Sequence, residues 1–269
     1  MSDISSPNLP EVSVVIPTYN DAVFLEKALS SLVNQTFQNW EALVIDNESF
    51  DNTAAVIKSF GDKRIKPYSI QNSGVIGSSR NLGINKAKAK YVAFLDSDDV
   101  WFPTKLEICV KKLNEGYDLL CHAEEWFNDR GRIKLVFYGP ESSADYKSLL
   151  YSGNKLSTSA ILVRRCCLNV VGGFSENPKH VTAEDYDLWM RLAKKTSKFI
   201  FVSDVLGAYR VHAKGNSRLL KRHRLAEYDV VRNHHLNFAG KSQFLFKIRV
   251  LRILTAFLRD SFKKMFERS

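Results

Sequence analysis

The chain has 269 residues, enough to bury a full hydrophobic core as one large domain or as one domain with a tail. Its composition, 45% hydrophobic and 25% charged, is ordinary for a soluble globular protein. The net charge of +10 is unevenly distributed. Residues 210–269 carry 15 Lys and Arg against 4 Asp and Glu (net +11), whereas residues 1–209 carry 24 against 25 (net −1), and this distribution excludes a uniformly basic surface.

The first hundred residues alternate between strand and helix patterns. Apolar runs predict three strands, at 12–16 (ended by Pro17), 40–45 and 91–95, and residues 65–70 are predicted as a further strand between the second and the last of these. Helical patterns lie between them, at 22–34 with Asn20 or Asp21 as the N-cap, at 52–60 capped by Asp51, and at 78–88. Because this alternation is typical of a parallel sheet covered on both faces, an α/β fold is predicted.

The next hundred residues continue the pattern less regularly. Helices are predicted at 104–114 and 183–195, and strands at 118–122, 160–163 and 199–202, with an irregular section at 126–159. We expect one compact domain over residues 1–212, followed by a basic helical extension over 213–269.

An acidic segment follows the fourth strand directly. Asp96-Ser97-Asp98-Asp99 comes after the apolar run Tyr91–Leu95, so its carboxylates are expected at the carboxyl edge of the sheet, where open α/β folds bind ligands. Clustered carboxylates repel one another and need a cation. Oxygen ligands favour Mg²⁺ or Mn²⁺, and Mg²⁺ is usually held by one or two carboxylates together with substrate phosphates. The segment therefore predicts an enzyme that handles a metal-bound phosphorylated substrate.

Five motifs in order carry a resemblance to a known family. They are Val12–Asn20, Ser79-Arg80-Asn81-Leu82-Gly83, Phe94–Asp99, Ala183–Trp189 and Tyr209-Arg210-Val211-His212. Residues 12–212 thus resemble the family 2 nucleotide-sugar glycosyltransferases. The resemblance implies a GT-A fold, a nucleotide-binding half over about 12–99, an acceptor half over about 100–212, a nucleotide-diphosphate sugar as donor, Mg²⁺ or Mn²⁺ as cofactor, and inversion at the anomeric carbon.

The resemblance also assigns roles to single residues. It implies that Asp98 and Asp96 are metal ligands and that His212 contacts the metal or the diphosphate. It also implies that Arg80 faces the phosphates of the nucleotide. A metal held there would absorb the charge that develops on the leaving phosphate. Asp185, supported by Glu184, becomes the base that takes the proton of the acceptor hydroxyl. The alternative for both acidic pairs is structural: a solvated acidic turn, or acids favoured at a helix N-terminus.

A second group of residues is expected at the nucleoside. Pro17, Tyr19 and Asn20 end the first strand, and Tyr19 is a candidate to stack on the base. Asp46 and Asn47 end the second strand. Many members of the family carry Asp-Asp where this chain has Asp46-Asn47, so the nucleotide base stays open between uridine, thymidine, guanosine and others. Trp101, Phe102 and Ser157-Thr158-Ser159 are weaker candidates to border the acceptor.

The C-terminal segment has an amphipathic helical pattern. One stripe is apolar (Phe244, Ile248, Leu251, Leu254, Leu258, Phe262 and Met265), and the neighbouring flank is basic (Arg249, Arg252, Arg259 and Lys263). Residues 241–269 are therefore expected to lie on an anionic membrane surface, or else to pack on the protein's own domain or on a second subunit in a homo-oligomer.

Localisation follows from what the sequence lacks. Residues 1–11 have no apolar segment of the signal-peptide type, and no stretch approaches the ~20 apolar residues of a membrane-spanning helix. The four cysteines have no paired metal-ligand spacing and are expected to be reduced thiols. We expect a cytoplasmic protein at the inner face of the cell membrane.

Three functions remain to be compared. The first is a glycosyltransferase that extends a glycan on a lipid carrier in bacterial cell-surface polysaccharide synthesis. The second is a sugar-phosphate nucleotidyltransferase, although Pro17-Thr18-Tyr19-Asn20 is not the Gly-rich basic loop of that class. The third is a nucleic-acid binder that uses the basic tail, although the tail has no recognised base-reading module, so no nucleic-acid partner is expected.

Overall fold

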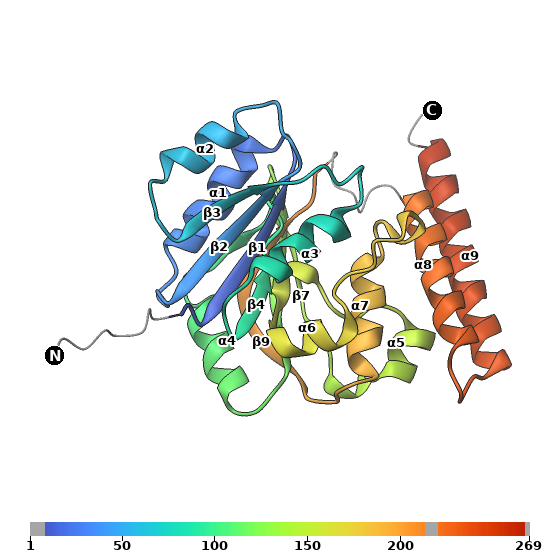
Figure 1. Ribbon diagram of the computed structural model, residues 1–269. Helices are drawn as coiled ribbons and strands as arrows, with labels where there is room; N and C mark the ends of the chain where they lie inside the picture. Colours follow the sequence, from blue (N-terminus) through green and yellow to red (C-terminus); the bar gives the residue numbers. More distant parts are fainter. Residues whose placement is uncertain (1–8, 213–219, 267–269) are drawn as a thin grey trace.

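The computed structural model describes residues 9–212 and 220–266, with the side chains of the last helix described through Asp260. The strands are β1 Val12–Thr18, β2 Trp40–Asp46, β3 Ile65–Ser69, β4 Tyr91–Phe94, β5 Val100–Trp101, β6 Leu119–Asn128, β7 Gly131–Val136, β8 Ile161–Arg164 and β9 Phe199–Arg210. The α-helices are α1 Ala22–Val33, α2 Thr53–Ser59, α3 Ile76–Lys86, α4 Lys105–Asn114, α5 Tyr146–Ser152, α6 Arg165–Val171, α7 Glu184–Ala193, α8 Leu220–Leu236 and α9 Gln243–Phe266. Figure 1 shows the sheet with helices on both of its faces.

The strands within the described residues form one mixed sheet in the order β3-β2-β1-β4-β8-β6-β9-β5, and β7 pairs with β6. The predicted parallel arrangement holds for β1 to β4. Alternate side chains along β1 enter two different cores, as the pleat of a strand requires: Val14 packs with residues of α1 and α4, and Val15 with residues of α3 and α7. Both faces of the sheet are therefore buried.

The second half of the sheet departs from the prediction. β8 runs antiparallel to β4, and β6 runs antiparallel to β8 but parallel to β9. β6 and β9 have 10 and 12 residues, much longer than the predicted 118–122 and 199–202. Polar residues conceal β6 in the sequence, because Glu124 lies in the strand and is buried, with one carboxylate oxygen accepting a hydrogen bond from Tyr138 at 2.6 Å. The section predicted as irregular thus contains the end of β6, all of β7 and α5.

The end of β1 also differs from the prediction, since the strand continues through Pro17 to Thr18. β1 pairs with β4 only as far as Val15, so beyond that point it has β2 as its neighbour on one side alone. A proline without an N–H is tolerated where a strand has one free edge. Pro17 is buried inside the strand.

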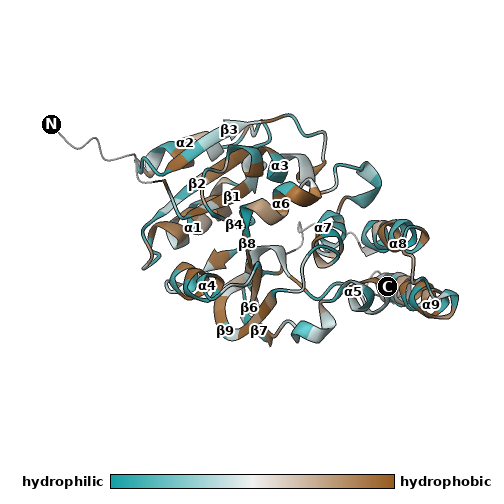
Figure 2. Ribbon diagram, turned by 60° about the horizontal axis from the view of Figure 1, so that its bottom comes forward, coloured by the Kyte–Doolittle hydropathy of each residue, from teal (hydrophilic) through white to brown (hydrophobic). Residues whose placement is uncertain are grey.

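Helices α8 and α9 form an antiparallel pair at one end of the molecule, away from β1–β3, in both Figure 1 and Figure 2. Phe246 stacks on His235 of α8, with ring centroids 4.1 Å apart, and Ile253 is buried. Arg249, predicted on the basic flank, is instead buried and paired with Glu227. The helical extension therefore packs on its own protein. None of the helices within the described ranges is long and apolar enough to cross a membrane.

A close helix–sheet contact in this fold gives a stability prediction. Gly83 of α3 packs on β1, and a Cβ at this position would overlap both γ-carbons of Val15. We expect Gly83→Ala to lower the free energy of unfolding by about 1–3 kcal/mol, since overpacking outweighs the ~1 kcal/mol that Ala gains over Gly in a helix. Urea unfolding measures this. The control is Asn85→Ala, at an exposed position of the same helix, which is expected to cost nothing; equal stability of the two variants would contradict the prediction.

Candidate active site

The carboxyl ends of β1, β2 and β4 meet at one edge of the sheet, and the acidic segment lies there. Asp96–Asp99 follows β4, and the end of β9 comes to the same place from more than a hundred residues further along the chain. His212 Nε2 lies 2.8 Å from Asp98 Oδ2, and the N–H of Arg210 donates to Asp99 Oδ1 at 2.8 Å. Two motifs far apart in sequence thus form one cluster.

The electrostatics of this cluster favour a cation. Burial raises the pKa of Asp98, and the neighbouring carboxylates of Asp96 and Asp21 raise it further, while His212 opposes them. Among the described residues, no three His, Cys, Asp or Glu side chains are gathered as a ready-made metal site. The carboxylate of Asp98 and the imidazole of His212 could hold a divalent cation of the kind that takes its remaining ligands from substrate phosphates and water.

Arg80 connects this cluster to the next one. Its side chain is 4% exposed and pairs with Asp96 Oδ1 through Nη2 at 2.7 Å and with Glu184 Oε1 through Nη1 at 2.6 Å. A buried guanidinium between two carboxylates compensates both charges and sets their separation. With both of these nitrogens committed, contact between Arg80 and a nucleotide phosphate stays a prediction. So does Asp96 as a metal ligand, since Asp96 is paired with Arg80.

Asp185 and Glu184 begin α7 on the other side of Arg80. Burial raises the pKa of Asp185 to about 6, and the adjacent Glu184 adds to the shift, while Arg80 opposes it. Asp185 Oδ1 accepts the N–H of Tyr186 at 2.7 Å, and Oδ2 lies 3.3 Å from Thr158 Oγ1 and 3.4 Å from Asn154 Nδ2. A partly exposed, oriented carboxylate with a pKa near 6 has the properties of a general base at neutral pH.

The backbone just before Asp185 is strained at Thr182, and a residue of helix α8 stabilises it. Thr182 has a φ of +84°, which is an outlier for a β-branched residue. Its N–H donates to Glu184 Oε2 at 2.7 Å, and its carbonyl accepts from Nδ1 of His223, on α8, at 2.8 Å. The contact with His223 was missed at the sequence level. Only the helical pattern of the C-terminal segment hinted that it would pack near the site.

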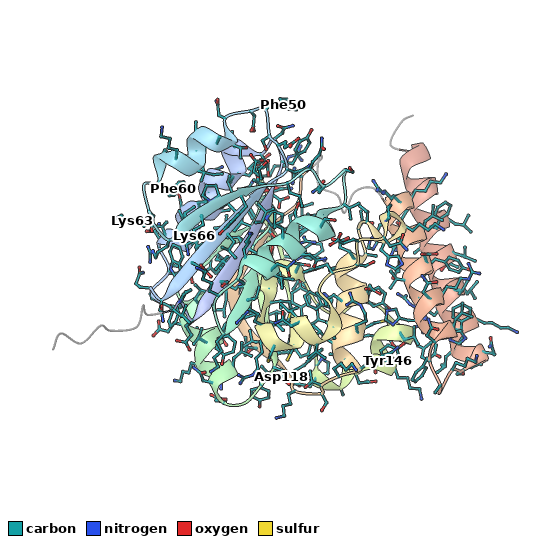
Figure 3. All side chains as sticks on the ribbon, in the orientation of Figure 1. Phe50, Phe60, Lys63, Lys66, Asp118 and Tyr146 are labelled. Carbon is teal, nitrogen blue, oxygen red and sulfur yellow. The ribbon has the colours of Figure 1, made fainter. Side chains whose placement is uncertain are left out.

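The nucleoside candidates lie together at the ends of β1 and β2. The N–H of Asn20 donates to Ser49 Oγ at 2.8 Å, and Ser49 in turn donates to Asp46. Asn47 Oδ1 accepts the N–H of Asn72 at 2.8 Å, which ties the β2 end to the loop before α3. Tyr19 is half exposed and meets Phe50, labelled in Figure 3, edge to face at 6.3 Å. Two open aromatic rings beside this edge suit a planar base.

The weaker acceptor candidates separate in the structure. Trp101 is 2% exposed and donates from Nε1 to the carbonyl of Ser159, so it belongs to the core. Thr158 reaches Asp185, as described above. Asn154, which also reaches Asp185, was missed; the only available signal was its position after Gly153 in a polar stretch.

Comparison with known proteins identifies the family of the chain. The model of the family "Glycosyl transferase family 2" matches residues 13–154, more than half of the chain. The Escherichia coli UDP-Glc:alpha-D-GlcNAc-diphosphoundecaprenol beta-1,3-glucosyltransferase WfgD is 31% identical over 183 residues, covering 68% of this chain and 70% of WfgD.

Two solved structures have the same fold. Staphylococcus aureus TarS 1–349, in complex with UDP-GlcNAc, superimposes with a TM-score of 0.70 at 23% identity, covering 94% of this chain and 73% of that one. The mannosyltransferase PcManGT of Pyrobaculum calidifontis, in complex with GDP-Man and Mn²⁺, gives 0.68 at 17% identity, covering 96% and 76%.

The matched family model and the similarity to WfgD identify the chain as a glycosyltransferase. This chain belongs to glycosyl transferase family 2. The resemblance drawn from the five motifs and the predicted fold class are both confirmed.

Proposed function

We propose that the protein is a metal-dependent, inverting glycosyltransferase that moves a hexose from a nucleotide-diphosphate donor to a hydroxyl of a lipid-linked glycan in bacterial cell-surface polysaccharide synthesis. The observation that carries the proposal is the continuous link Asp96–Arg80–Glu184. It holds the candidate donor cluster and the candidate base on the two sides of one buried arginine.

On the acceptor side, Asp185 is the base. Its carboxylate accepts the hydroxyl proton as the acceptor oxygen forms a bond to the anomeric carbon, and the bond from that carbon to the diphosphate oxygen breaks on the opposite face. The hydroxyl of Thr158 and the amide of Asn154 both approach Oδ2, so they orient the carboxylate. Arg80 pairs with Glu184 and so partly compensates the second negative charge beside the base.

On the donor side, Tyr19, Asn20, Asp46 and Asn47 are proposed to receive the nucleoside, with the buried Pro17 supporting the strand end beneath them. Asp98 and His212 would hold the divalent cation, Mg²⁺ or Mn²⁺, with Asp96 beside them. When bound, that cation supplies charge neutralisation for the departing diphosphate. WfgD is named for UDP-Glc, TarS is in complex with UDP-GlcNAc and PcManGT is in complex with GDP-Man, so uridine and guanosine donors are both tested below.

The acceptor and location form the finer part of the proposal. WfgD, by its name, acts on a sugar linked through diphosphate to undecaprenol, and this supports a lipid-linked acceptor here. An enzyme without a membrane-spanning helix in its described residues would meet such an acceptor as a peripheral protein at the inner face of the membrane.

The proposal is tested by thermal unfolding with a panel of nucleotide sugars. In the presence of Mn²⁺, we expect one of UDP-glucose, UDP-GlcNAc, GDP-mannose and dTDP-glucose to stabilise the protein by about 2.7 kcal/mol at a hundredfold excess over its Kd, on the order of 5–10 °C in Tm. Matched sugar 1-phosphates are the control. No shift with any nucleotide sugar would reject the function, and an equal shift in EDTA would reject the metal.

A further inference from the structure

Helix α9 presents two different faces. Its inner face packs on α8 and α5: Leu245, Phe246 and Ile253 join the hydrophobic core, and Arg249 pairs with the buried Glu227. Its outer face, opposite at 100° per residue, carries four large apolar side chains in water. They are Phe244 (70% exposed), Leu251 (61%), Leu254 (52%) and Leu258 (55%).

This outer face is the apolar stripe seen in the sequence, as far as the side chains are described. A single exposed leucine is ordinary, but four large apolar side chains exposed on one face over four turns make an apolar surface of the kind that binds another phase or molecule. Packing of α9 on its own protein therefore does not use the stripe. From the sequence we expected this helix either to pack on its own protein or to expose an apolar face to a membrane. In the structure the inner side of α9 packs on the protein, and the outer side exposes the apolar stripe.

The charges around the stripe select the partner. Helices α8 and α9 form a helical hairpin, and each acidic residue of its described part has a partner within the protein. Glu227 pairs with Arg224 and Arg249, Asp229 with His180, and Asp260 with Arg224. The exposed charges of the hairpin are basic: Lys221, Arg222, Arg232, Lys241, Lys247, Arg252 and Arg259. A second copy docked through this face would bring like charges together. An anionic surface would match them.

We propose that the outer face of α9 binds an anionic lipid bilayer, with Phe244, Leu251, Leu254 and Leu258 at the boundary between headgroups and acyl chains. Lys247, Arg252 and Arg259 then meet lipid phosphates. The inference rests on the proposed function in one respect, because a lipid-linked acceptor gives the enzyme its reason to be at a membrane. In this arrangement the outer face of α9 contacts the lipid, and the inner face packs on the rest of the protein.

Co-sedimentation of the full chain with vesicles tests the proposal. We expect binding to phosphatidylglycerol vesicles and at least tenfold weaker binding to phosphatidylcholine vesicles. Leu251→Ser/Leu258→Ser is expected to weaken binding to the anionic vesicles at least tenfold. Arg252→Gln/Arg259→Gln is expected to weaken it about 25-fold, since each basic residue near an anionic surface contributes about fivefold. The matched control is Ile133→Ser/Val170→Ser, which removes two exposed apolar side chains elsewhere and is expected to bind as the unchanged protein does.

Two results would overturn the proposal. One is anionic-vesicle binding that the α9 variants leave unchanged. The other is a dimer in light scattering that Leu251→Ser/Leu258→Ser converts to monomer, which would assign the face to a second copy. Thermal stabilisation by the donor, measured without vesicles, separates this outcome from the proposed function. The α9 variants are expected to keep that stabilisation, whereas failure of the function would abolish it in the unchanged protein too.

Discussion

Replacement of Asp185 by Asn is expected to lower kcat by about 10²- to 10⁴-fold, the usual contribution of a positioned general base. The amide keeps the size of the side chain and can still accept from the N–H of Tyr186, but it cannot take a proton from the acceptor hydroxyl. Donor binding should survive, because Asp98 and His212 are unchanged. Transfer rates measured with the donor found by thermal unfolding, alongside the donor-induced shift in Tm, give the two readouts.

The pH dependence of the same enzyme supplies an independent check. Since the pKa of Asp185 is raised to about 6, the base is ionised above that pH and protonated below it. For the unchanged protein, kcat/KM should therefore be level above about pH 7 and should fall tenfold per pH unit well below 6. Asp185→Asn should lose this acid limb.

The control for both measurements is a nearby acid outside the site. Glu176 is exposed and bonds to Ser78 and Asn81, so Glu176→Gln is expected to keep both the rate and the acid limb. Retained turnover in Asp185→Asn would remove Asp185 from the role of base.

Much of the nucleotide half could be predicted from the sequence because its signals are local. The strands β1, β2 and β4 each contain an apolar run. The polar residues that follow them meet at one edge because parallel strands share their carboxyl ends. The acidic segment Asp96–Asp99 is therefore placed by its own neighbours in sequence. The pairing of Asp98 with His212 required the family resemblance, since the two lie on segments joined by the fold alone.

The features of the site and of the C-terminal helices that were not predicted depend on contacts between segments far apart in the sequence. On an isolated helix Arg80 would be a solvated surface residue, and only the approach of α7 buries it between Asp96 and Glu184. The strain at Thr182 and its support by His223 depend on where α8 packs. Likewise, the periodicity of α9 described its stripe correctly, but Arg249 is buried because Glu227 faces it, a pairing that helical spacing within one element does not contain.

Loss of the proposed metal pair is expected to have the second large effect. Asp98→Asn should lower kcat/KM by about 10²- to 10³-fold, because a catalytic cation contributes several kcal/mol and each ~1.4 kcal/mol is tenfold in rate. Unlike Asp185→Asn, it should also abolish the Mn²⁺-dependent part of the stabilisation by a nucleoside diphosphate. His212→Ala should have the same character.

The double variant distinguishes a shared ion from two separate roles. Asp98 Oδ2 and His212 Nε2 lie 2.8 Å apart. Substitutions of side chains that act on one ion have strongly non-additive effects. The Asp98→Asn/His212→Ala double variant should therefore be about as slow as the slower of the two single variants. Asp129→Asn is the matched control, since Asp129 is an exposed acid that contacts Arg210 beside the same cluster, and it should retain full Mn²⁺ dependence. A different result would contradict a shared ion. If the losses in kcat/KM of the two single variants multiply in the double variant, and each single variant still binds the nucleotide in a Mn²⁺-dependent way, then Asp98 and His212 support the acidic loop and the cation is held elsewhere.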